Sequence, residues 1–72
     1  NNMGGSEMVT YYVIYDTFAR AFVRQGRSGL VLWTTNLSAA KHFTSQWSAD
    51  NYLRQGRGED LCNCIVKKIQ RY

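Results

Sequence analysis

The strongest run of β-branched and aromatic residues in the chain covers residues 9–15 and ends at Asp16. Such residues favour a strand, because they pack well on a pleated, half-buried surface. A short apolar run at 30–33 and a mixed run at 61–69 predict two more strands, and each follows a glycine-containing turn.

Residues 17–24 allow two interpretations. In one, Asp16 caps a helix that places Phe18 and Phe22 one turn apart. In the other, small and apolar residues alternate with a second set that includes two arginines, as in a half-buried strand. We favour the strand, because the glycine-rich residues 25–29 that follow suit the turn of a hairpin.

The pattern changes from period two to period three after Thr35. Over residues 37–43 apolar side chains recur at three-residue spacing, and at 100° per residue they share one face of a helix. These apolar positions are Leu37, Ala40 and Phe43. His42 falls on the opposite side, and Thr35 or Asn36 can act as the N-cap. The spacing therefore predicts a first short helix.

A second helix is predicted over residues 46–55. Ser45 can cap its first turn, and Gly56 stands where a glycine commonly ends a helix. Its apolar face consists of Ala49, Tyr52 and Leu53.

The predicted order is strand, strand, strand, helix, helix, strand, which is an α+β fold. We expect a three- or four-stranded antiparallel sheet with two short helices on one face. Helices on one face leave the other open, so some of the tyrosines of residues 9–15 should lie on an open sheet face. We expect a single domain over 8–72, since 72 residues cannot form two cores, and a polar tail over 1–7 that is disordered or derives from an expression vector.

The composition is that of a globular protein, with 44% apolar and 19% charged residues. No apolar run approaches the roughly 20 residues that span a bilayer, so we expect no membrane partner. Nine basic residues face five acidic ones, and the net charge of +4 favours acidic partners such as nucleic acid or an acidic protein surface.

The cysteine content predicts a reducing compartment. Cys62 and Cys64 are separated by one residue, so on a strand they lie on the same face about 7 Å apart. That spacing is too wide for an unstrained disulfide, and both are expected to be partly buried structural thiols. The cytoplasm is the expected location.

Residues with catalytic or metal-binding chemistry are few. Cys62, Cys64 and His42 could bind zinc or form a Cys–His pair, but a fourth ligand is not evident and His42 points away from the predicted helix core. Glu59 and Asp60 are adjacent in a loop rather than spaced as a catalytic pair. We expect no metal, no cofactor and no enzymatic activity.

Trp47 is the most informative single residue. On the second helix it lies about 160° from the centre of the apolar face, on the same side as Asn51 and Arg54. Trp and Arg are enriched at binding hot spots, which predicts a protein interface there. The alternative, that Trp47 folds back onto the first helix, stays open. The strand tyrosines Tyr11 and Tyr15 are further predicted binding residues, on the open sheet face.

Basic turns offer a different function. Arg24, Arg27 and Arg57 lie at predicted turns and could contact phosphates, while aromatic residues on an open sheet face could stack on bases. These features are typical of a small basic nucleic-acid-binding accessory domain, which is our second hypothesis.

Residues 37–45, followed by Ala49 and Leu53, resemble the helix pair of many small proteins encoded by phages and prophages of Gram-positive bacteria. In those proteins strands like 11–14 and 64–69 flank the helices. The resemblance implies a non-enzymatic binding protein in the cytoplasm of the bacterial host. It would occupy a surface on a host protein or protein–nucleic acid complex and inhibit host machinery, as anti-CRISPR proteins do. A homodimer formed through the open sheet face is a further expectation.

Overall fold

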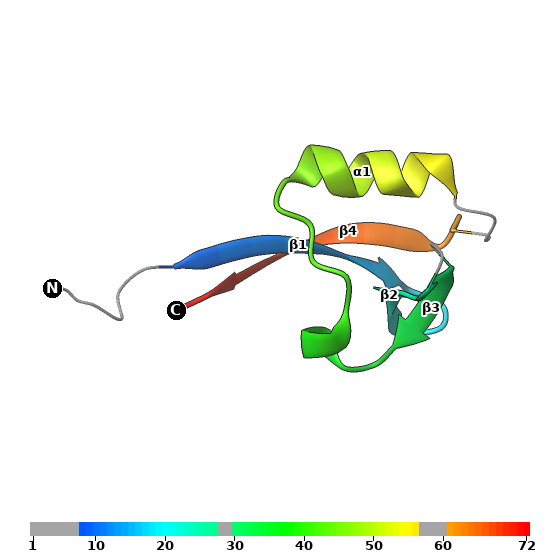
Figure 1. Ribbon diagram of the computed structural model, residues 1–72, viewed down its shortest axis with the longest axis horizontal. Helices are drawn as coiled ribbons and strands as arrows, with labels where there is room; N and C mark the ends of the chain where they lie inside the picture. Colours follow the sequence, from blue (N-terminus) through cyan, green and yellow to red (C-terminus); the bar gives the residue numbers. More distant parts are fainter. Residues whose placement is uncertain (1–7, 28–29, 57–60) are drawn as a thin grey trace, which may run out of the picture.

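A computed structural model of the protein describes residues 8–27, 30–56 and 61–72. The α+β class is confirmed, with a four-stranded antiparallel sheet and an α-helix on one of its faces (Figure 1). In chain order the elements are β1 (Val9–Asp16), β2 (Ala21–Gln25), β3 (Val31–Thr34), the 3-10 helix η2 (Leu37–Ala39), α1 (Gln46–Gln55) and β4 (Cys64–Arg71).

The sheet has the strand order β3-β2-β1-β4, so the first and last strands of the chain are neighbours. They pair along their whole length, from Val9 opposite Arg71 to Asp16 opposite Cys64. At the end that carries the termini, the two strands extend beyond α1 as a ribbon (Figure 1). Strand β3 begins one residue later than predicted and β4 three residues later.

Strand β2 confirms the strand interpretation for the second half of residues 17–24 only. The Asp16 carboxylate accepts hydrogen bonds from the backbone N–H groups of Phe18 and Ala19 at 2.8 and 2.9 Å. Arg20 then adopts a positive φ of 59°, and its N–H donates to the Asp16 carbonyl. Asp16 thus caps a tight turn between β1 and β2, not a helix.

The prediction of two helices is wrong in one detail, because residues 37–43 do not form the first of them. Asn36 does cap a turn, accepting a hydrogen bond from the Ser38 N–H, but this turn is only the 3-10 helix η2. The backbone becomes extended at Ala40, with a ψ of 153°.

The chain leaves the helical conformation at Ala40 because the residues that follow form backbone hydrogen bonds with strands of the sheet instead of with one another. Strand β2 pairs with β1 only near the turn, at Tyr15 with Phe22 and at Asp16 with Ala21. Further along, Tyr12 and Phe43 exchange a pair of backbone hydrogen bonds of 2.9 and 2.8 Å.

Residues 41–43, called here the crossing segment, also bond to β2, since the Lys41 N–H donates to the Val23 carbonyl at 2.9 Å. Residues 41–43 therefore link β2 to β1, and the chain passes from the side of the sheet where η2 lies to the side of α1 (Figure 1). Satisfying strand backbone groups outweighs the weak helical preference of residues 37–43.

Helix α1 is confirmed, with its predicted bounds and caps. The Ser45 hydroxyl accepts a hydrogen bond of 3.1 Å from the Ser48 N–H. Gly56 ends the helix at a φ of 72°, a conformation that a residue without a side chain adopts at little cost.

The hydrophobic core lies between α1 and the sheet. Ile14, Val23 and Ala49 are completely buried within it, and the rings of Phe43 and Tyr52 meet edge to face at 5.3 Å. Lys41 contacts the same rings, with its ammonium 5.2 Å from the centre of Phe43 and 5.9 Å from that of Tyr52.

Phe43→Ala should lower the free energy of unfolding by about 3–5 kcal/mol, because it removes the ring that joins the crossing segment to the helix. Thermal melting followed by circular dichroism measures this loss. Phe18→Ala is the matched control, since this ring is 86% exposed at the turn after β1 and its loss should change stability by about 0.5 kcal/mol or less. Equal melting temperatures for the two variants would contradict the assigned core.

Candidate interaction surfaces

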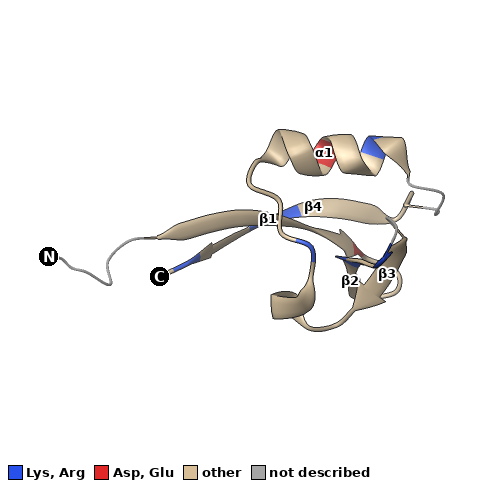
Figure 2. Ribbon diagram, viewed as in Figure 1, with Lys and Arg blue, Asp and Glu red and all other residues tan. Residues whose placement is uncertain are grey.

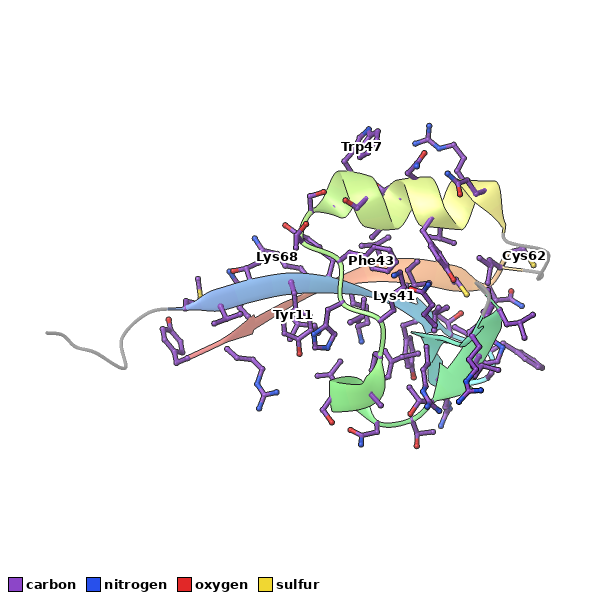
Figure 3. All side chains as sticks on the ribbon, in the orientation of Figure 1. Tyr11, Lys41, Phe43, Trp47, Cys62 and Lys68 are labelled. Atoms are coloured by element: carbon purple, nitrogen blue, oxygen red, sulfur yellow. The ribbon has the colours of Figure 1, made fainter. Side chains whose placement is uncertain are left out.

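Trp47, Asn51 and Arg54 form one stripe on α1, which we call the outer helix face. Their spacing of four and seven residues places them within about 60° of one another around the helix. Trp47 is 73% exposed, Arg54 is exposed and Asn51 is half-buried. Trp47 points away from the sheet (Figure 3). The alternative in which it folds back onto a first helix does not occur, because residues 37–43 form no such helix.

The predicted interface is divided between two sides of the sheet. Side chains alternate along a strand, and Ile14 belongs to the core beneath α1. Tyr11 and Tyr15 therefore lie on the opposite side, which Figure 3 shows for Tyr11. The structure brings Trp47, Asn51 and Arg54 together and does not bring the tyrosines to them.

The side of the sheet opposite α1 is called here the far sheet face. The strand registers assign to it Val9, Tyr11, Val13, Tyr15, Phe22, Arg24, Leu32, Thr34, Ile65, Lys67, Ile69 and Arg71.

Part of the far sheet face is covered by the protein itself. Val13 is completely buried, although it points away from the core beneath α1. His42 stacks on Tyr11 with ring centres 4.0 Å apart and an interplanar angle of 24°. The 3-10 helix η2 lies on this side of the sheet (Figure 1). The predicted open face is thus open over only part of its area.

The open part centres on an aromatic pair. The rings of Tyr15 and Phe22 lie side by side on neighbouring strands, with centres 5.0 Å apart. The Lys67 ammonium lies 4.8 Å from the centre of the Tyr15 ring. Ile65 and Leu32 are 46% and 41% exposed on the same face. Aromatic and aliphatic surface therefore lies next to positive charge.

The two faces differ in charge. The far sheet face carries Arg24, Lys67 and Arg71 and, among the described residues, no acidic side chain. The described acidic residues lie elsewhere, Asp16 on the α1 side of the sheet and Asp50 on α1 itself, whereas basic positions occur on the sheet, in its connecting segments and on α1 at Arg54 (Figure 2).

The predicted basic turn contacts do not form one group. Arg24 lies within β2 rather than in a turn, and Arg27 is exposed in the segment that follows. Arg57 lies outside the described residues, as do Glu59 and Asp60.

The cysteines differ from their predicted arrangement. Both are thiols, and Cys64 packs against the core from the first position of β4. The prediction of two partly buried strand thiols is wrong for Cys62, which is exposed in the preceding turn. The strand starts late because the Cys64 N–H closes a turn with Leu61, while the Asn63 carbonyl accepts bonds from Thr17.

Side chains that could bind metal or act in catalysis are scattered over the described part of the chain. There, His, Cys, Asp and Glu do not gather in any group of three or more that could hold a metal ion. Within the same residues, no helix has the length and apolar character needed to cross a membrane.

Sequence reasoning missed Phe22 and Lys67 as surface residues. Phe22 lies in residues 17–24, which allowed either a helix or a strand, so the direction of its side chain was undecided. Lys67 was one of several basic residues in the last predicted strand. Their alternation with Val23 and Val66, which face the core, was the available signal. Only the register shows that both residues lie beside Tyr15.

Comparisons of the chain with protein-family models, curated proteins and solved structures found no match.

The different positions of the cysteines have a measurable consequence. Cys64→Ala should lower the free energy of unfolding by about 1 kcal/mol, because it removes a packed sulfur, whereas Cys62→Ala should change it by about 0.5 kcal/mol or less. Denaturant titration checks both values. A thiol reagent should also modify Cys62 of the native protein first, and faster modification of Cys64 would contradict the assignment.

Proposed function

We propose that the protein is a non-enzymatic binding protein that occupies a surface on a protein of its host cell. The observation that carries this proposal is the 73% exposure of Trp47 on the outer helix face, in line with Asn51 and Arg54. A large exposed indole is costly in water, and its burial against a partner is favourable.

The chemistry of the outer helix face suits a protein partner. Trp and Arg are the side chains most enriched at interface hot spots, and Asn51 between them can donate and accept hydrogen bonds. Asp50 on the same helix gives this side both signs of charge, which a protein surface can complement and a phosphate backbone cannot. Helix α1 is capped at both ends and packed on the sheet, so the stripe is presented rigidly.

The sequence of residues 37–45 resembles that of phage and prophage proteins, although residues 37–43 do not form the first helix of the pair found in those proteins, and this resemblance is the ground for the partner that we propose. It supports a role in the cytoplasm of a bacterial host, as an inhibitor of host machinery of the kind that anti-CRISPR proteins represent. The partner is a host protein, alone or within a protein–nucleic acid complex, and no cofactor takes part.

Trp47→Ala should weaken binding to the partner by about 2 kcal/mol or more and leave folding unchanged, because the ring packs on little of its own protein. A photoreactive amino acid at position 47 should crosslink one host protein in nuclease-treated bacterial lysate. Titration calorimetry with that protein then compares Trp47→Ala with the native chain.

Phe18→Ala is the matched control, since it removes an aromatic ring of greater exposure at a different place. It should leave affinity unchanged, and a photoreactive residue at position 18 should give no such crosslink. Equal losses for the two variants, or binding that disappears after nuclease treatment, would contradict the proposal. A steep fall of affinity with salt would favour the nucleic-acid-binding hypothesis instead.

A further inference from the structure

We infer that the open part of the far sheet face binds single-stranded nucleic acid. This site goes beyond the proposed function, because it lies on the opposite side of the sheet from Trp47 and uses different side chains. Its elements are an aromatic pair, aliphatic surface and positive charge on adjacent strands.

Tyr15 and Phe22 provide the stacking surface. Their rings lie 5.0 Å apart on neighbouring strands and are tilted by 55°, so they form a stepped surface rather than a closed stack with each other. Both are half-buried, which holds the rings in place and leaves part of each accessible. Stacking on aromatic side chains is how single-stranded nucleic acid is held without regard to base sequence.

Basic side chains lie beside the two rings on the same face, where they can contact phosphates. The Lys67 ammonium lies over the Tyr15 ring, 4.8 Å from its centre, so Phe22 is the more accessible ring for a stacked base and Lys67 can contact a phosphate of the same strand. Arg24 follows Phe22 two residues on along β2 and projects from the same face. Arg71 extends this charge along β4 towards the C-terminus.

The charge of this face also decides between occupants. Two copies meeting through it would bring a face that carries Arg24, Lys67 and Arg71 against an identical, equally positive face. No acidic side chain of the described residues lies on this face to compensate. Like charges facing each other are unfavourable, whereas a polyanion with flat bases complements both the cations and the rings.

Fluorescence anisotropy with labelled oligodeoxythymidine and oligouridine tests the site, and a duplex of equal length shows whether exposed bases are needed. Single strands should bind and the duplex should bind more weakly. The stronger of the two single-stranded probes identifies DNA or RNA as the ligand. Lys67→Gln and Arg24→Gln should each weaken binding and reduce the slope of log affinity against log salt by about 0.7. Phe22→Leu should weaken it about fivefold or more.

Arg54→Gln and Trp47→Ala on the outer helix face are the matched controls and should leave oligonucleotide affinity within about twofold, since they act at the other surface. Circular dichroism melting of each variant shows that it folds. If Phe22→Leu does not fold, crosslinking of iodouracil oligonucleotides to the native protein replaces it and should modify Tyr15 or Phe22.

The outcomes are distinguishable. Absence of single-strand binding at low salt, equal effects of Arg54→Gln and Lys67→Gln, or crosslinking at Trp47 would each overturn the inference. A dimer in light scattering that Lys67→Gln strengthens would assign the face to a second copy instead. Of these results, only crosslinking at Trp47 also bears on the proposed function, because it would place nucleic acid on the outer helix face.

Discussion

The pair of backbone hydrogen bonds between Tyr12 and Phe43 is the interaction on which the rest of the structure depends. Strand β1 pairs with β2 only at Tyr15 and Asp16. Earlier in β1, at Tyr12, the backbone hydrogen bonds are made with Phe43 of the segment 41–43 instead. This pairing fixes the point at which the chain crosses from one side of the sheet to the other. Phe43 then enters the core beneath α1, while the preceding residue, His42, stacks on Tyr11 on the far side.

Both surfaces follow from this crossing. Because Phe43 and Tyr52 meet edge to face, α1 lies with Ala49 and Tyr52 inward, and Trp47 is left on the outer helix face. Because η2 and His42 stay on the other side, they cover one part of the far sheet face and leave the Tyr15–Phe22 pair open. A small domain exposes much of its surface in any case. Here the exposed apolar groups are divided into two groups of different charge.

Much of the fold could be predicted from the sequence, because the strongest local patterns agree with the tertiary structure. The β-branched run at 9–15 and the caps Ser45 and Gly56 determine β1 and α1 almost completely. Residues 37–43 show where a local pattern fails. Their three-residue spacing of apolar side chains fits a helix. An extended segment also fits, because it places the neighbours His42 and Phe43 on opposite sides of the sheet. The competing backbone bonds come from Tyr12 and Val23, which are distant in sequence, so no local pattern could reveal them.

The candidate surfaces were predictable to a similar extent. The angular position of Trp47 on a helix depends only on local spacing, so its direction was correct. That Tyr11 and Tyr15 lie on the opposite side of the sheet from Trp47 could not be read from local spacing, because deciding which side of the sheet the helix covers requires the register of β1 with its neighbours. The pairing of Tyr15 with Phe22 and Lys67 depends on strand order, which the sequence does not encode locally.

Amide hydrogen exchange measured by NMR tests the role of the crossing segment most directly. If residues 41–43 are part of the sheet, the amides of Phe43 and Lys41 should exchange as slowly as those in the centre of β1 and β4. The amides of residues 37–39 should exchange much faster, since only a single 3-10 turn holds them. Fast exchange at Phe43, or uniform slow exchange across 37–43 as in a continuous helix, would contradict the account.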